Sequence, residues 1–253
     1  MQEDAQCQNE LGATEATLIQ QLVEAQRAGT SSVDAVAYST LDREAAYRVQ
    51  HGVMVALGEK PGMYKTAVAP DGTGAIAPIY ASRVGESASF QLPLANIIGL
   101  EVEVGVVLAK DVPNGTDDID LVEAISHYFV GLEVCGTRYI DRSKAGFDGG
   151  LADSMAAYGY VINPAEREPG ADLDNFDVTV EFNGQQIYAA PAKHGFGTVL
   201  ASLVAYAKAQ RPEYPLKAGT IITTGSVCGL VPTSGTGHAV AVLGNHRVEF
   251  DIV

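Results

Sequence analysis

Apolar residues recur every three or four positions in two stretches near the start of the chain. The stripes consist of Leu18, Leu22 and Ala25 in the first stretch and Ala46, Val49, Val53 and Leu57 in the second. A glycine follows each stretch, Gly29 and then Gly58, and glycine commonly ends helices. The spacing predicts two amphipathic helices, one from Thr14 and one from Asp42.

The next segment, residues 59–78, has neither helical nor strand periodicity. Glycine and proline punctuate it, but it is too apolar in places for a disordered linker. We therefore expect a structured loop. The residues alone favour an exposed loop lysine at Lys65, and a lysine that closes over a site as part of a lid is the alternative.

Alternation of polar and apolar residues begins at Gly99. Glu101 and Glu103 fall on one face of the predicted strand and valines on the other, because successive strand side chains point to opposite sides. Two later segments alternate around turn residues 183–184 and 244–245, and they predict hairpins.

Helical spacing returns between these strands. Residues 117–134 predict a helix that runs into a strand, and residues 197–209 predict another helix before a short strand at 219–225. Strict strand–helix alternation is missing, so we expect one mixed α/β (α+β) unit of mainly antiparallel character. Within it, residues 1–98 would form a helical N-terminal section with the loop, and residues 99–253 a mixed β part.

The charge balance restricts the partners of the protein. The 253 residues include 31 acidic and 16 Lys or Arg side chains, which gives a formal net charge of -15 at pH 7. Such a polyanion is repelled by phosphate backbones and by anionic lipid, which argues against nucleic acid and membrane as partners. An anionic small substrate would need a local positive centre, either a metal or a lysine.

Cysteine usage and the absence of apolar runs bear on location. The three cysteines include no CxxC pair, which predicts neither a disulfide framework nor a zinc site. No apolar run is long enough for a membrane span, and the first ten residues are polar. We expect a cytoplasmic protein, although an exported protein whose signal has been removed would show the same sequence.

The most informative chemical feature is a group of carboxylates in apolar surroundings. Glu101 and Glu103 point the same way from a strand of valine and leucine, and Glu133 lies in a similar context. Like charges this close repel, and burial without a partner costs several kcal/mol. A divalent cation such as Mg²⁺ or Mn²⁺ would resolve both problems, since no basic residue stands beside them in sequence. An ordinary solvated strand face is the alternative.

Four ordered segments carry a family resemblance: GLEVEVGVVL, GLEVCGTRYIDR, LADSMA and LKAGTIITTGSVCG. Their order and spacing resemble the fumarylacetoacetate hydrolase superfamily, and within it the branch of 2-keto-4-pentenoate hydratases and 4-oxalocrotonate decarboxylases. The resemblance covers most of the chain. It implies a barrel-like or roll-like β core, a homo-oligomer and a role in aromatic catabolism.

The resemblance also implies roles for individual residues. The metal ligands for Mg²⁺ or Mn²⁺ would be Glu101, Glu103 and Glu133. Lys65 and Asp153 would be catalytic, and the substrate would be bound by Ser154, Thr224, Gly225 and Ser226.

The sequence departs from the family pattern near the lysine. Ala75 stands where the family has an aspartate that assists proton transfer, and Asp71 is the nearest acid in sequence. Met63 and Ala67 replace glycines, and Ser154 replaces an asparagine. These changes keep a second hypothesis open, in which the chain is a catalytically silent relative that binds a metal or a 2-oxo acid.

For an enzyme, the resemblance implies a lyase that adds water to a small unsaturated 2-oxo acid, similar to 2-hydroxypenta-2,4-dienoate. The carboxylate and oxo group can chelate a cation that stabilises an enolate. Lys65 would relay protons, with its pKa lowered by burial and by the cation. Decarboxylation of a 2-oxo dicarboxylate, or C–C hydrolysis, would use the same chelate and stays open.

Other reactive side chains carry weaker signals. His194 precedes a predicted helix, and we expect a solvated loop residue there, with anion binding as the alternative. His127 falls on the predicted helix of residues 117–134, where it would pack or face solvent. Cys135 and Cys228 stand in apolar surroundings, which is typical of structural burial.

Overall fold

The computed structural model describes residues 12–93, 95–163 and 175–253. The two helices predicted near the start are present as α2 (Ala13–Ala28) and α3 (Arg43–Leu57). Gly29 and Gly58 end them in the left-handed conformation, and the Asp42 side chain accepts a hydrogen bond from Ala45 N at 2.8 Å. The two helices pack against each other, and α3 also packs against α5 (Gly146–Ala152).

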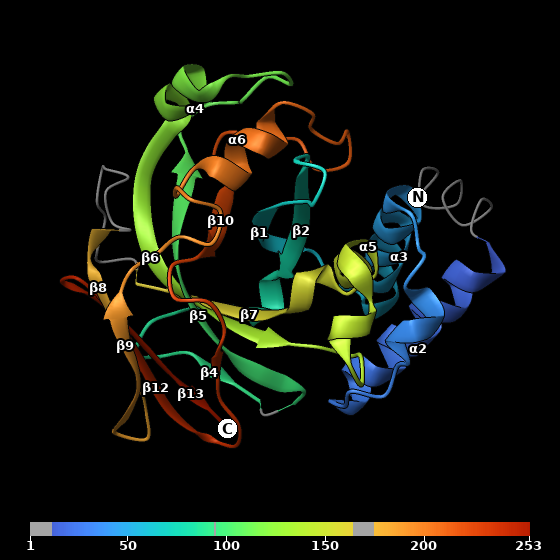
Figure 1. The fold of residues 1–253 in the computed structure, drawn as a ribbon, viewed down its shortest axis with the longest axis horizontal. Coiled ribbons are helices and arrows are strands. Elements are labelled where there is room, and N and C mark those ends of the chain that lie inside the picture. The colour runs from blue at the N-terminus through green and yellow to red at the C-terminus, as the bar shows by residue number, and fades with distance from the viewer. Residues whose placement is uncertain (1–11, 94, 164–174) are drawn as a thin grey trace.

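An eight-stranded sheet curls around the centre of the molecule (Figure 1). Its strands are β1 (Pro61–Val68), β2 (Gly74–Tyr80), β3 (Val84–Glu86), β5 (Ile97–Leu108), β6 (Ile125–Gly136), β7 (Ala157–Ile162), β10 (Ile221–Ser226) and β11 (Val231–Pro232). The order is β2-β1-β10-β5-β6-β7-β3, and β11 pairs with β5. Most pairs are antiparallel, whereas β1 with β10 and β3 with β7 are parallel.

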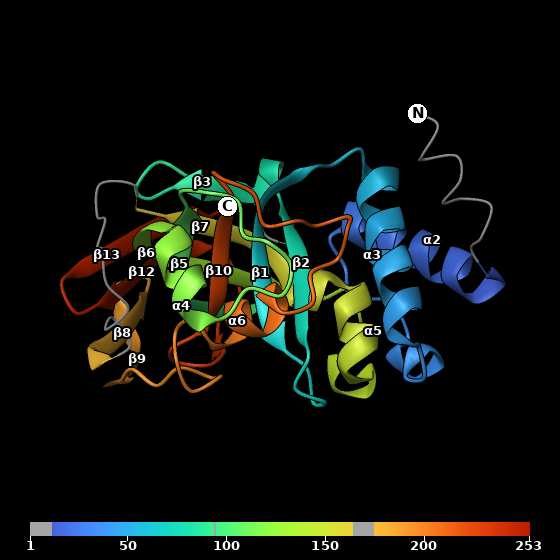
Figure 2. The ribbon, with the colours of Figure 1, turned by 90° about the horizontal axis from the view of Figure 1, so that it is seen from above.

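A second, five-stranded sheet packs behind β5 and β6. Its strands are β4 (Gln91–Leu92), β8 (Asp177–Phe182), β9 (Gln185–Pro191), β12 (Gly237–Leu243) and β13 (His246–Ile252). Both predicted hairpins are present, and Asn183 and Gly184 take the positive φ angles of 53° and 74° that a tight turn requires. The helices α2, α3 and α5 lie at the other end of the molecule (Figure 2).

The expected loop at residues 59–78 is wrong: the segment is a β-hairpin formed by β1 and β2. Both strands are largely buried, and burial against neighbouring strands outweighs the local Gly and Pro signals. Pro78 is tolerated because β2 is the edge of the sheet, where no ladder hydrogen bond is lost. Lys65 therefore stands on a strand within the sheet and cannot act as a mobile lid.

The helix expected from residue 117 is too long. The helix α4 ends at Ala124 and β6 begins at Ile125, so His127 lies on a strand. The following aromatic and β-branched residues pair with β5 along the whole strand, and this pairing overrides the helical spacing. The helix α6 (Ala201–Ala207) is likewise shorter than the spacing predicted.

The two faces of β5 have opposite environments. Its valines Val102, Val104 and Val106 are 0% exposed and belong to the main apolar core, together with residues of the second sheet such as Ala241 and Val248. The other face points into the curl, where the glutamates lie. A division after residue 98 falls inside β5, and β1 and β3 from before it pair with β10 and β7 from beyond it.

Candidate active site

The acidic residues of β5 and β6 converge on the inner face of the curled sheet. Glu101 pairs directly with Glu133 across the two strands, and Glu103 follows two positions along β5. Directly opposed residues of an antiparallel pair project from the same face. Glu103 and Glu133 are 0% exposed, and Glu101 is partly exposed. The register therefore brings Glu133 of β6 next to the two carboxylates of β5.

Lys65 reaches this group from β1. Its Nζ donates to both carboxylate oxygens of Glu133, at 2.5 and 2.7 Å, and to the Met155 carbonyl at 3.3 Å. No basic residue stands beside the glutamates in sequence, but a strand distant in sequence supplies one. Burial alone would lower the pKa of Lys65, but the charges of Glu133 and Glu103 raise it above its ordinary value. The neighbouring carboxylates thus hold the amine as an ammonium.

Glu103 is held at one oxygen only. The Thr223 hydroxyl donates to Glu103 Oε2, whereas Oε1 is buried and has no hydrogen-bond partner among the described residues. Burial raises the pKa of Glu103 well above its usual range, and the charge of Glu133 adds to this effect. A buried carboxylate oxygen without a partner is costly, which marks the position as one that an additional group would stabilise.

Cys135 was assigned to structural burial from sequence, but it also borders the acidic cluster. Its Sγ and one oxygen each of Glu101 and Glu133 all lie within 4.8 Å of one another. Burial raises the pKa of the thiol well above 9, and Glu101 adds to this effect, so the group is protonated and is a poor metal ligand. Cys135 and Glu133 are two positions apart on β6 and so share a face, which the sequence spacing already indicated.

A cavity of about 460 Å³ opens beside the cluster. Lys65, Glu101 and Glu103 of the sheet line it, together with Gly225 and Ser226. Gly225 has a φ of 117°, and a Cβ there would lie 2.9 Å from the Phe196 ring, so glycine is needed. The remaining lining residues include Arg142, Phe147, Met155 and Phe196, which the sequence patterns did not single out.

Thr224 is not among the residues that line this cavity. Its hydroxyl donates to the Val104 carbonyl at 2.7 Å, and its own carbonyl accepts from Ser202 of α6 at 2.7 Å. Its neighbour Thr223 points into the curl instead, because successive residues of β10 alternate. Thr223, and not Thr224, is therefore the residue of this pair that contacts Glu103.

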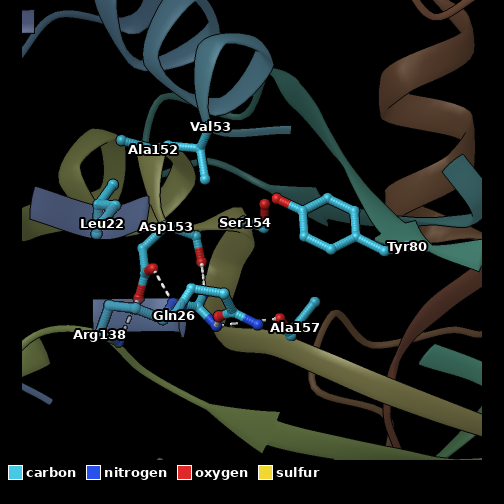
Figure 3. A pocket seen from close by; sticks show the side chains of 9 residues that line it. All are labelled: Leu22, Gln26, Val53, Tyr80, Arg138, Ala152, Asp153, Ser154 and Ala157. Carbon is cyan, nitrogen blue, oxygen red and sulfur yellow. Dashed lines mark hydrogen bonds and ion pairs between the residues drawn. The ribbon is translucent and has the colours of Figure 1, made fainter. Parts of the chain in front are cut away.

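Asp153 and Ser154 directly follow α5 and line a separate small space with Leu22 of α2 and Val53 of α3 (Figure 3). Asp153 forms a buried ion pair with Arg138, and its carboxylate also accepts from Thr137 Oγ1 at 3.0 Å and Arg138 N at 3.1 Å. The adjacent space measures about 10 Å³, which is too small for a substrate. Neither residue lines the large cavity.

His194 is buried rather than solvated, with 4% of its surface exposed. Its Nδ1 accepts from Phe196 N at 3.2 Å, and its Nε2 lies 3.4 Å from Thr224 Oγ1. The imidazole therefore supports the loop that carries Gly195 and Phe196, both of which line the cavity.

No carboxylate of the β1–β2 hairpin replaces the missing family aspartate. Ala75 is paired with Ala67 and is 0% exposed. Asp71 caps the hairpin turn, where it accepts from Thr73 N at 3.0 Å. Neither Ala75 nor Asp71 lines the cavity.

The donor set of the site fits a hard divalent cation. Three carboxyl groups lie near one ammonium, so the cluster would carry a surplus of negative charge when its carboxyl groups are ionised. The unpartnered Glu103 Oε1 offers a ready ligand atom, and carboxylate oxygens are what Mg²⁺ and Mn²⁺ prefer.

Comparisons with known proteins define the class. A family model described as fumarylacetoacetate (FAA) hydrolase, C-terminal, matches residues 64–252. The chain belongs to the fumarylacetoacetate hydrolase family. This confirms the resemblance inferred from the four ordered segments.

Two of the similar proteins are 4-oxalocrotonate decarboxylases. A curated 4-oxalocrotonate decarboxylase from a Pseudomonas species is 25% identical over 134 residues, and the match spans 52% of this chain and only 51% of that relative. The solved 4-oxalocrotonate decarboxylase from Pseudomonas putida G7, complexed with magnesium and adipate, has a TM-score of 0.77 at 19% identity. That match covers 94% of this chain and 97% of the other.

A second solved structure shares the fold less closely. The 2-hydroxyhepta-2,4-diene-1,7-dioate isomerase from Mycobacterium marinum has a TM-score of 0.54 at 18% identity, over 76% of this chain and 73% of that one. Among the described residues, no helix is both long and apolar enough to cross a membrane.

Proposed function

We propose that this protein is a metal-dependent lyase that acts on a short unsaturated 2-oxo acid. The observation that carries the proposal is the convergence of Lys65 with Glu101, Glu103 and Glu133 beside one large cavity, which all of them except Glu133 line. A cavity of about 460 Å³ suits a small organic acid. Relatives named as decarboxylase and isomerase of unsaturated oxo or hydroxy diacids support the substrate class.

Glu101, Glu103 and Glu133 would hold the cation, which we infer to be Mg²⁺ or Mn²⁺. When bound, the cation supplies Lewis-acid polarisation of the 2-oxo group and so favours the enolate. A solved relative complexed with magnesium supports this choice of metal. The cation also supplies the local positive centre that an anionic substrate needs in a protein of net charge -15.

Lys65 would move the proton. Its Nζ stands at the base of the cavity beside the carboxylates, within reach of a substrate bound there. A dication that neutralises Glu133 and Glu103 removes the charges that raise the pKa of Lys65, so the amine becomes a better proton donor.

Decarboxylation is the form of this chemistry that we favour over hydration. If the glutamates bind the cation, Lys65 is the one proton-transfer group left among the residues that line the cavity. Loss of CO₂ leaves an enolate that needs a single proton, whereas hydration also requires a group that activates or positions water. The alanine at position 75, where the family has its aspartate, argues in the same direction.

Arg142 adds a reason to expect a dicarboxylate. It is exposed, lines the cavity on the α5 side and forms no ion pair with the described residues. A guanidinium in this position can receive a second carboxylate in bidentate fashion, away from the cation. A 2-oxo dicarboxylate would thus be anchored at both ends.

The test is a product assay with Mg²⁺ or Mn²⁺ and a panel of short 2-oxo dicarboxylates and 2-hydroxydienoates. We expect CO₂ release from a dicarboxylate and loss of that turnover in Lys65→Met. A hydrated product without CO₂ would support the hydratase instead. Binding of the cation without turnover of any acid would support a catalytically silent relative.

A further inference from the structure

Three buried side chains form a line through the interior of the curled sheet, from Tyr160 on β7 through Thr223 on β10 to Glu103 on β5. The Tyr160 hydroxyl lies 3.0 Å from Thr223 Oγ1, and the Thr223 hydroxyl donates to Glu103 Oε2. All three residues are 0% exposed. Hydroxyls in such a place must be hydrogen-bonded, so the line is fixed and not one of many rotamers.

The direction of the hydrogen bonds follows from the carboxylate end. The Thr223 hydroxyl donates to Glu103 Oε2, so its single proton is committed there and its oxygen is left to accept. Tyr160 must then be the donor to Thr223 Oγ1. The line binds Oε2 of Glu103 and leaves Oε1 buried without a partner among the described residues.

The sheet makes room for this line at Gly131, which pairs with Glu103 across β5 and β6. A Cβ at Gly131 would lie 2.1 Å from the Tyr160 ring and 2.5 Å from its hydroxyl oxygen. A side chain there would displace the ring, and glycine inside a strand often marks such a close approach. The Tyr160 ring also contacts Phe129 edge-on, at 6.3 Å between ring centroids.

We propose that Thr223 and Tyr160 are positioning residues of the cation site, which hold Glu103 by Oε2 so that Oε1 is presented to the ion. The inference rests on the proposed metal-dependent function and adds two residues that do not themselves touch the ion. Hydrogen bonds to a ligating carboxylate pre-set its orientation and lower the reorganisation that binding requires.

A purely structural explanation is that Thr223 only satisfies the buried Tyr160 hydroxyl. If only folding were at stake, a phenylalanine at 160 and a valine at 223 would remove that need altogether. Both are favoured in strands and bring no polar side-chain atom to bury. The two explanations differ in one respect: a structural pair affects folding, whereas a positioning pair affects Mg²⁺ affinity.

The test measures Mg²⁺ binding by titration calorimetry, with urea unfolding of each metal-free protein alongside. Thr223→Val, which is nearly isosteric, should weaken Mg²⁺ binding about 10- to 100-fold. Thr223→Ser, which restores the hydroxyl, should recover most of the loss. Tyr160→Phe should weaken binding by a smaller factor, because Thr223 still donates to Glu103.

A double-mutant cycle adds a stricter criterion. If Tyr160 acts through Thr223, Tyr160→Phe has no further effect on Mg²⁺ affinity once Thr223 is valine. Matched controls are Tyr206→Phe, which removes a buried hydroxyl that donates to Tyr214 O, and Thr116→Val, which removes one that donates to Pro113 O. Both should change stability at most, and not Mg²⁺ affinity.

The outcomes separate this inference from the proposed function. Unaltered Mg²⁺ affinity in a folded Thr223→Val protein, or independent effects of the two substitutions, overturns the inference and leaves the metal site standing. A native protein that binds neither Mg²⁺ nor Mn²⁺ overturns both. Should Thr223→Val fail to fold, the comparison of Thr223→Ser with Tyr160→Phe still decides, because only the latter should weaken binding.

Discussion

Among the residues that the structure describes, two ion pairs are buried on both sides, and they differ in what surrounds them. Lys65 with Glu133 stands at the base of a cavity of about 460 Å³, and Arg138 with Asp153 borders a space of about 10 Å³. All four residues are at most 7% exposed. Burial and charge are therefore alike in the two places and do not tell them apart.

The two pairs differ in how completely their polar atoms are hydrogen-bonded. The Asp153 carboxylate accepts from Arg138 Nε and from the Arg138 backbone N, and the Asp153 carbonyl accepts from Arg138 Nη2 (Figure 3). The Thr137 hydroxyl also donates to the carboxylate. Around Lys65, by contrast, two more carboxylates stand nearby and Glu103 Oε1 has no partner among the described residues. We infer that the first pair secures the fold and the second is prepared for a ligand. Unmet bonding capacity beside free space is the better indicator of a functional site.

The largest expected effect is on the saturated pair. Asp153→Asn leaves Arg138 buried without its counter-charge, which should lower the free energy of unfolding by about 3 to 5 kcal/mol. Urea denaturation measures this loss, and Mg²⁺ affinity of the folded fraction should stay unchanged. Full stability combined with lost turnover would instead return Asp153 to the catalytic role expected from sequence.

Glu103→Gln is the corresponding change in the unsaturated cluster. We expect Mg²⁺ affinity to fall about 100-fold or more, equivalent to about 2.8 kcal/mol, because a charged ligand is lost. The metal-free protein should be at least as stable as the native one, since a buried and repelled charge is removed. A marked loss of stability without change in Mg²⁺ affinity would make the cluster structural, like the Arg138 pair.

Arg142→Met tests the far side of the cavity. The substitution keeps much of the side-chain length and removes the charge, so KM for a 2-oxo dicarboxylate should rise about 10-fold while kcat changes little. KM for a 2-oxo monocarboxylate should not change. Lys144→Met, on the same short helical turn but not lining the cavity, is the matched control.

The smallest effect is a pH dependence of the metal-free protein. Burial raises the pKa of Glu103 and of Glu133, so between the unfolded and folded pKa values the native state holds more protons than the unfolded one. Stability should therefore rise as pH falls from neutral towards about 4.5 and be lost as pH rises. Saturating Mg²⁺ should reverse this slope, since it binds the ionised form; an unchanged slope in thermal unfolding would contradict metal binding by these groups.

The candidate site could be anticipated from sequence in part. The alternation around Glu101 and Glu103 indicated a shared face, and the apolar context of Glu133 indicated burial. Only a family motif points to Lys65. The Gly and Pro residues around it predict a loop, whereas the segment is a strand. Thr223 and Tyr160 carried no usable signal, since their roles depend on the register of four strands.

By itself, the sequence determined the two N-terminal helices, both hairpins, the polarity of β5 and the family, because these depend on residues close together in the chain or on ordered motifs. The tertiary structure alone decided that Lys65 neutralises Glu133 and that Asp153 belongs to a different, saturated pair. The reason is physical: spacing fixes which way a side chain points, but only the curl of the sheet fixes which charges it meets and which remain without a partner.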